Sequence, residues 1–345
     1  MKQYNTVEEA IEAFYENNLI DPDIYISDEN EAYIQNKECD YLIGKDIFSL
    51  HVNEWLQSFS NSDINIFLNL LGNYTYITRR EYRHKISLLS ESTFATLNAL
   101  NIPFSDAIFI TTPSPKGLKS GGDEIRSYFN SVNICRGIKN NQIICSQELV
   151  SPDIFKDKTT IIFIDDLIGS GKTIKASIEK LLKYFQNNNI DSSMFQIFFA
   201  GIFVNNSARK KIIKHFNSLN VTVKPIYMEL PKKLLKGDVI FDSKEFAQVI
   251  SVIKKYEDLI DAYQFNTSFK TYSMGFDKCK LTVSFYYNTP NNTLCNFWEY
   301  SDTHIPLFER RTQSVNRPTV NELKNRKSNN TINAYLQKAK KNESV

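Results

Sequence analysis

The sequence predicts an α/β fold with a Rossmann-like, mostly parallel sheet, a helical N-terminal region and a basic, mobile C-terminal tail. Three continuous apolar runs have the length of strands and are rich in β-branched and aromatic residues; they span residues 107–110, 161–164 and 197–204. Helical patterns follow them at residues 123–132, 173–185 and 207–219. Continuous apolar strands that alternate with helices indicate βαβ units around a buried parallel sheet.

Residues 1–104 are expected to form a mostly helical region that packs on the core. Two stretches of the capping-box type begin at Thr6 and Thr78, and each opens an amphipathic helical pattern. Five basic residues crowd the first turns of the second helix: Arg79, Arg80, Arg83, His84 and Lys85. This basic cluster is either a solvated helix face or a site for an anion or a partner.

Residues 105–308 are expected to form the α/β core, which also contains a strand at 221–228, a helix at 244–263 and a strand at 281–287. The segment 309–345 differs, because nine basic and three acidic residues give it a net charge of +6 and leave about −4 on the rest. Few apolar residues occur there, so we expect a mobile tail. The tail is either a solvated end or a contact for nucleic acid, whose affinity would fall with salt.

Composition excludes several classes of protein. The 345 residues include 41 Lys and Arg against 39 Asp and Glu, so the chain as a whole does not coat a polyanion. A content of 42% hydrophobic and 13% aromatic residues excludes a disordered chain, and the absence of a run of about 18 apolar residues argues against a membrane span. The five cysteines include no C-x-x-C pair, which argues against structural zinc or a disulfide framework. The N-terminus lacks a secretory pattern, so we expect a cytoplasmic protein.

The stretch from residue 161 to residue 173 carries the clearest chemical signal. A buried strand runs into Asp165 and Asp166, and a helix starts after a loop of small residues. Ligands of parallel sheets bind at the carboxyl ends of the strands. Backbone N–H groups, hydroxyls and the helix dipole at such a turn bind a phosphate. The candidate phosphate-binding residues are Gly169, Ser170, Gly171, Lys172 and Thr173.

Two kinds of phosphate ligand compete for this loop. The Gly-Lys-Thr triplet suggests a nucleoside triphosphate site, but that motif needs a glycine where Asp166 stands, and a carboxylate there would repel a triphosphate. A ribose 5-phosphate fits better, because carboxylates can accept hydrogen bonds from the vicinal hydroxyls while the loop holds the 5-phosphate. A surface turn with an ordinary pair of aspartates is the structural alternative.

Residues 161–173 resemble, at every defined position, the phosphoribosyl pyrophosphate (PRPP) motif of type I phosphoribosyltransferases, with Lys172 in place of a small residue. The resemblance implies a type I phosphoribosyltransferase core, PRPP as co-substrate, and Mg²⁺ bound mainly through PRPP and water with no protein ligand directly predicted. Asp165 and Asp166 would be the catalytic residues that hold the ribose while a nitrogen nucleophile displaces pyrophosphate. Some members of this fold only sense PRPP, so a binding module without turnover is the alternative.

The resemblance extends to the loop after the strand at 107–112. Lys116, Gly117 and Ser120 occupy the position at which these enzymes bind pyrophosphate, although a Pro/Gly-rich surface loop would have the same composition. By position alone, residues 135–146 would correspond to the mobile catalytic loop.

A further resemblance concerns the Asn-Thr-Pro-Asn-Asn stretch at 288–292, which Trp298 follows. It is similar to the C-terminal motif of the PRTase-CE-type effectors, phosphoribosyltransferase-like proteins of bacterial antiviral conflict systems that include retron-associated ones; this similarity spans residues 80–300. It implies a toxic effector of anti-phage defence with an unknown acceptor. A reverse transcriptase ribonucleoprotein with its RNA–DNA hybrid is the partner that it suggests. A nucleic-acid-binding subunit built around the tail is a third class of function.

Asn288, Asn291, Asn292 and Trp298 are candidates for a base or acceptor pocket, because amides pair with base edges and an indole stacks. We expect the strand at 281–287 to join an edge of the parallel sheet, so that Asn288 or Asn292 contacts the ribose or the acceptor and Trp298 supports the segment from behind. An Asn-Pro turn over a core tryptophan is the alternative.

Overall fold

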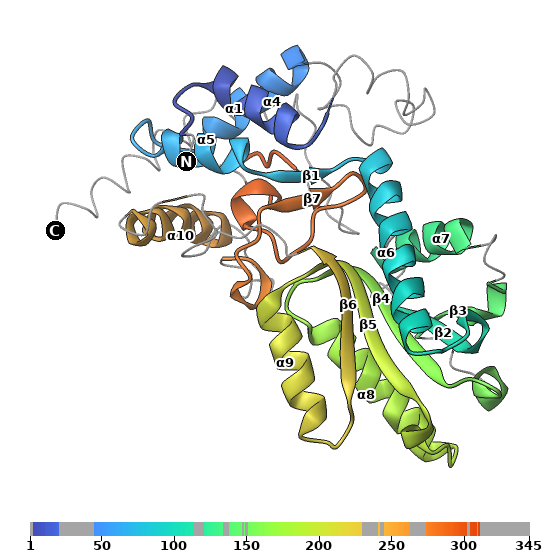
Figure 1. The fold of residues 1–345 in the computed structure, drawn as a ribbon. Coiled ribbons are helices and arrows are strands. Elements are labelled where there is room, and N and C mark those ends of the chain that lie inside the picture. Colours follow the sequence, from blue (N-terminus) through green and yellow to red (C-terminus); the bar gives the residue numbers. More distant parts are fainter. Residues whose placement is uncertain are drawn as a thin grey trace.

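The computed structural model describes residues 3–20, 45–112, 121–133, 138–146, 148, 151–229, 241, 245–262, 274–301, 304–308 and 310. These residues contain a five-stranded parallel sheet with the strand order β3-β2-β4-β5-β6 (Figure 1). The strands are β2 (Ala107–Thr111), β3 (Ile143–Cys145), β4 (Thr160–Ile168), β5 (Gln196–Val204) and β6 (Val223–Glu229). The predicted α/β class with a mostly parallel sheet is confirmed.

Helices cover both faces of this sheet. Ile161 and Phe163 of β4 pack with α8 (Lys172–Asn187) and α9 (Asn206–Asn217). The alternate residues Ile162 and Ile164 lie in the apolar cluster that includes α6 (Arg79–Ala99) and α7 (Gly121–Asn133), and Figure 1 shows these two helices together on the other side of the sheet. Burial on both faces explains why the strands are apolar without alternation.

The N-terminal helices pack on a segment from the other end of the chain. They are α1 (Val7–Asn17), α4 (Lys45–Leu56) and α5 (Ile64–Gly72), and α10 (Phe246–Ala262) lies beside them in Figure 1. The ring of Phe14 stacks on those of Phe48 and Phe308, with centroids 5.0 and 5.6 Å away. The Trp55 indole Nε1 donates to the Asn296 carbonyl over 2.8 Å. Aromatic contacts thus join the two ends of the described chain.

The strand predicted at residues 281–287 is shorter and pairs elsewhere. Only β7 (Val283–Phe285) is regular, and it pairs in parallel with β1 (Thr75–Ile77) as a separate two-stranded sheet. The expected addition to an edge of the main sheet is therefore wrong. The reason is that β7 hydrogen-bonds with β1, which follows α5 closely. β1 has only three residues, and no apolar run in the predicted helical region indicates it.

The local start signals act as the sequence predicts. The Thr6 hydroxyl accepts from the Glu9 N–H and the Thr78 hydroxyl accepts from the Glu81 N–H, at 3.2 and 3.1 Å. Short 3-10 turns lie at Phe104–Asp106, Asn140–Gln142, Pro152–Phe155, Ser192–Met194, Phe276–Lys278 and Cys295–Phe297. Within the described chain no helix has the length and apolar character that a membrane crossing needs. The tail from residue 311 onward lies outside the described residues.

Candidate functional site

The two aspartates lie near the carboxyl end of the central strand. β4 continues to Ile168, so both acids belong to the strand, whereas the sequence predicts the apolar strand to end before them. Asp165 pairs in register with Gly201 of β5. From the strand on the other side, the Thr112 hydroxyl donates to Asp165 Oδ2 over 3.0 Å. The acid pair is thus held between two neighbouring strand ends, where parallel sheets bind ligands.

The two carboxylates differ in their hydrogen bonds. Asp165 Oδ1 accepts from the Asp166 N–H at 3.0 Å, and Asp166 Oδ1 accepts from the Leu167 N–H at 2.6 Å. Asp166 is 6% exposed, and its Oδ2 has no hydrogen-bond partner among the described residues. Burial raises the pKa of Asp165 to about 6. Burial and the charge of Asp165 raise the pKa of Asp166 well above its usual range.

These pKa shifts predict how stability depends on pH. A carboxyl group with a raised pKa in the folded state stabilises the protein below its unfolded pKa and loses that contribution as the pH rises through its folded pKa. The unfolding free energy of the unliganded protein is therefore expected to fall between about pH 4 and 6 because of Asp165, and Asp166 contributes a loss in the same direction as the pH rises through its own raised pKa. For each proton that the folded state binds and the unfolded state does not, the unfolding free energy falls by about 1.4 kcal/mol per pH unit.

Urea unfolding between pH 4 and 8 checks this expectation when it is run on the wild type and on the Asp165→Asn, Asp166→Asn double variant. Taking the difference between the two proteins removes the contribution of all other titrating groups. Identical pH dependence in the two proteins would show that the acids are not desolvated as the structure has them.

The carboxylate of Asp166 lies against the first residue of α7. A Cβ atom added to Gly121 would approach both carboxylate oxygens to 2.3–2.4 Å, so no side chain fits at this position. The N-terminus of α7 therefore lies beside the acid pair, where the helix dipole favours negative charge. In the sequence, the signal for this position is the Gly121-Gly122 pair at the start of the helix.

The predicted phosphate loop has the expected form. α8 begins at Lys172, and its N-cap Gly171 has a φ of +80°, a conformation that favours glycine. The Ser170 hydroxyl accepts from the Lys172 N–H at 3.3 Å. Thr173 is exposed in the first turn of the helix. The loop can thus offer backbone N–H groups, two hydroxyls and the positive end of the helix dipole to an anion.

Lys172 forms an ion pair with a residue far away in sequence. Asp277 lies 3.1 Å from its ammonium group and 2.9 Å from that of Lys211. These two cations hold the pKa of Asp277 below its usual range, although partial burial opposes the shift. The Lys172 ammonium also lies 4.7 Å from the centre of the Phe276 ring. Asp277 is 105 residues away from Lys172 in sequence, so no local pattern could have predicted the pair.

Among the three asparagines, the structure brings Asn292 to the phosphate loop. A Cβ atom added to Gly169 would come within 2.4–2.8 Å of the Asn292 amide group. The same amide donates from Nδ2 to the Phe276 carbonyl and to Cys279 Sγ, both at 3.2 Å. Asn292 is 8% exposed, so its substitution would remove buried hydrogen bonds.

The other members of this segment have structural contacts. Asn288 closes a turn: its Oδ1 accepts from the Thr289 N–H and its carbonyl from the Phe285 N–H, at 2.9 and 3.0 Å. The Asn291 carbonyl accepts from the Phe276 N–H at 2.7 Å. The Trp298 indole is 3% exposed and donates to the Thr293 carbonyl at 2.8 Å. That contact is the one expected of a residue that supports the segment from behind.

The remaining predicted sites divide between described and undescribed residues. The pyrophosphate candidates Lys116, Gly117 and Ser120 lie outside the described residues. The placement of a mobile catalytic loop at 135–146 is wrong for its last part, because Ile143–Cys145 forms the edge strand β3 beside β2. β-branched residues that pair with a neighbouring strand are typical of a sheet.

The basic cluster on α6 is only partly a solvated face. Lys85 is 8% exposed, pairs with Glu81 at 3.2 Å and lies over the ring of Phe203. The Arg79 guanidinium donates to the Tyr128 hydroxyl on α7 at 3.1 Å. At least these two residues therefore serve packing between α6 and its neighbours.

Comparison with known proteins gives one finding. The family model described as PRTase-CE matches residues 52–310, which confirms the resemblance that the sequence shows to effectors of this type. No curated protein and no solved structure matches the chain. The match includes the acid pair, the phosphate loop and the asparagine segment.

Proposed function

The chain belongs to the phosphoribosyltransferase-like PRTase-CE family, and from this premise we propose that it binds PRPP and transfers the phosphoribosyl group to an acceptor with release of pyrophosphate. The observation that carries the proposal is the position of the acid pair on β4, next to the loop at the start of α8 and beside two strand ends. Carboxylates that accept hydrogen bonds and a loop that donates them are what a ribose 5-phosphate requires.

Each group would have a distinct role in this reaction. The loop N–H groups and the hydroxyls of Ser170 and Thr173 would hold the 5-phosphate. Asp165 and Asp166 would accept from the ribose hydroxyls, and their negative charge would favour an oxocarbenium-like state at C1. Among the described residues no three metal-ligating side chains converge. Mg²⁺ would be held mainly by the diphosphate and by water, and it would neutralise the leaving group.

The biological setting is part of the proposal. Its support is the family match over residues 52–310, together with the resemblance of the sequence to effectors of bacterial antiviral conflict systems. We place the chain as an effector of a bacterial anti-phage defence system, with a ribonucleoprotein that contains a reverse transcriptase as its candidate partner and the basic tail as a candidate contact. In that setting, phage protection or toxicity depends on the acid pair.

Release of pyrophosphate by the purified protein in the presence of PRPP, Mg²⁺ and candidate acceptors tests the proposal. PRPP binding without any release, across nucleotide, nucleic acid and protein acceptors, would instead support a module that senses PRPP and regulates a partner. If the protein binds neither PRPP nor ribose 5-phosphate, both the transferase proposal and the sensing alternative are overturned.

The hydroxyls of the phosphate loop give a specific prediction. Ser170→Ala and Thr173→Ala are each expected to weaken binding of ribose 5-phosphate about 10-fold, because each removes a hydrogen bond to a charged group. Binding of unphosphorylated ribose should not change. Ser207→Ala is a matched control, since Ser207 is the second residue of α9 as Thr173 is of α8. Titration calorimetry of the wild type and the three variants measures the affinity for each of the two ligands.

The nucleoside triphosphate alternative makes the opposite prediction at the same loop. There, Lys172→Ala would abolish ATP hydrolysis by the pure protein. ATP hydrolysis that Lys172→Ala stops would contradict the phosphoribosyl proposal.

A further inference from the structure

Two buried polar atoms, one in the acid pair and one on α6, have no hydrogen-bond partner among the described residues. One is Asp166 Oδ2, and the other is the hydroxyl of Tyr82, a fully buried residue in the second turn of α6. A buried polar group without a partner is costly, so such groups are normally paired with protein, water or a ligand. Both atoms therefore call for an explanation.

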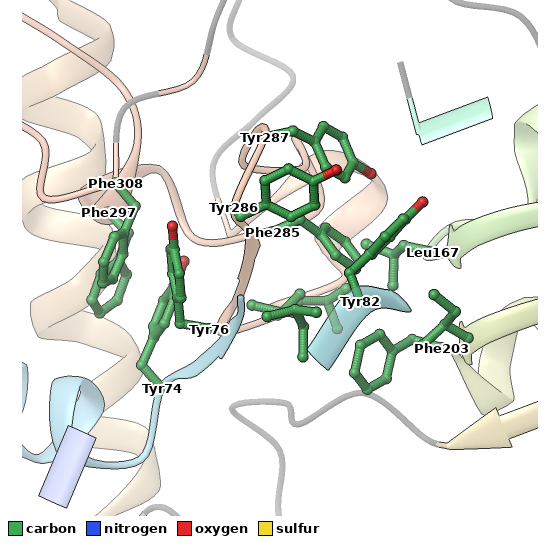
Figure 2. Packing of buried hydrophobic residues seen from close by; sticks show 14 of the residues in the cluster. Tyr74, Tyr76, Tyr82, Leu167, Phe203, Phe285, Tyr286, Tyr287, Phe297 and Phe308 are labelled. Atoms are coloured by element: carbon green, nitrogen blue, oxygen red, sulfur yellow. The ribbon is translucent and has the colours of Figure 1, made fainter. Parts of the chain in front are cut away.

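The ring of Tyr82 is held firmly by other aromatic rings. Phe285, Tyr286, Tyr287 and Tyr128 surround it with centroids at 5.6–5.8 Å, each close to perpendicular. In Figure 2 the ring lies beside those of Phe285, Tyr286 and Tyr287, and its hydroxyl points to the same side as those of Tyr286 and Tyr287. The position of the Tyr82 hydroxyl is therefore set by the packing of its ring.

A chain of contacts connects this aromatic group with the acid pair. The Tyr286 hydroxyl donates to Glu124 Oε2 at 3.0 Å, and Glu124 lies one turn after Gly121, the residue against which the Asp166 carboxylate lies. Burial raises the pKa of Tyr82, and the charge of Asp166 is the next largest cause. The aromatic group around Tyr82 and the acid pair are thus connected through α7.

We propose that Tyr82 is a ligand-binding residue of this site, and that its hydroxyl and Asp166 Oδ2 together bind one hydroxyl group of the ribose. The phenol donates and the carboxylate accepts, so the group between them must both accept and donate, as an alcohol does. A deoxy position could do neither. This inference rests on the proposed function and extends it, because it adds a residue that recognises a hydroxylated pentose phosphate.

Ribose 5-phosphate and its 2-deoxy and 3-deoxy analogues are the probes that test this assignment. Tyr82→Phe is expected to weaken ribose 5-phosphate binding about 10-fold, the scale of a hydrogen bond to a buried site. It should leave unchanged the affinity for the one analogue that lacks the bridged hydroxyl. The melting temperature should stay the same or rise, since the substitution removes a buried polar atom without a partner.

Tyr184→Phe is the matched control. Its hydroxyl is also buried without a partner among the described residues, but it lies twelve residues beyond Lys172 on α8. This variant should match Tyr82→Phe in stability and the wild type in affinity for all three probes.

The possible failures are distinguishable. Unchanged binding of ribose 5-phosphate by Tyr82→Phe would overturn the inference and leave the proposed function intact. Equal weakening of all three probes would overturn it too, because it would indicate a distorted site and not a lost hydrogen bond. If the wild type binds neither ribose 5-phosphate nor PRPP, the proposed function fails and this inference fails with it.

Discussion

The double substitution Asp165→Asn, Asp166→Asn is expected to weaken binding of PRPP and ribose 5-phosphate by about 100-fold or more. Each carboxylate contributes a hydrogen bond of about 1.5–3 kcal/mol to the ligand, and the two act on one ribose. Asparagine keeps the shape of the side chain and an oxygen that can accept from Thr112 or the Leu167 N–H. The loss should therefore appear in ligand affinity much more than in folding.

Titration calorimetry with both ligands measures this loss, and circular dichroism checks that the variant is folded. Asp157→Asn is a suitable control: Asp157 is exposed, and its φ of +58° is one that asparagine adopts readily. If the double variant binds as tightly as the wild type, the acid pair is not the ribose site. In cells, any toxicity or phage protection should fall together with affinity.

Much of the fold can be read from the sequence because its elements are marked locally. Strands buried on both faces appear as continuous apolar runs, and Thr6 and Thr78 begin helices where the capping pattern predicts. The aspartates interrupt the apolar run of β4, yet Leu167 and Ile168 still pair with β5, so the strand is longer than its apolar run. The parallel pair of β1 and β7 joins segments about two hundred residues apart, and local periodicity carries no information about such contacts.

The candidate site divides in the same way. The acid pair and the phosphate loop are contiguous in sequence, so residue types and spacing are sufficient to identify them. Gly121 and Asp277 each reach the site from a different element, and only the folded chain brings them there. Periodicity assigns Tyr82 correctly to the apolar face of its helix, but it says nothing of where the hydroxyl at the end of the ring lies.

Trp298→Ala is expected to lower the unfolding free energy by about 3–5 kcal/mol, the usual cost of removing a large buried aromatic side chain. The melting temperature should fall by roughly 5–15 °C. The indole is 3% exposed, its Nε1 donates to the Thr293 carbonyl, and the Arg310 guanidinium lies 5.4 Å from the ring centre. Thermal and urea unfolding of the variant measure both quantities.

The effect should also extend to ligand binding, which separates Trp298 from an ordinary core residue. Trp298 holds Thr293, and the preceding residue Asn292 contacts Gly169 of the phosphate loop. Trp298→Phe is the informative companion: it keeps an aromatic ring but leaves the Thr293 carbonyl without its donor, at a cost of about 1–3 kcal/mol. At a temperature where both variants are folded, affinity for ribose 5-phosphate should fall in the order wild type, Trp298→Phe, Trp298→Ala. A stable Trp298→Ala protein with wild-type affinity would show that the indole supports neither the core nor the asparagine segment.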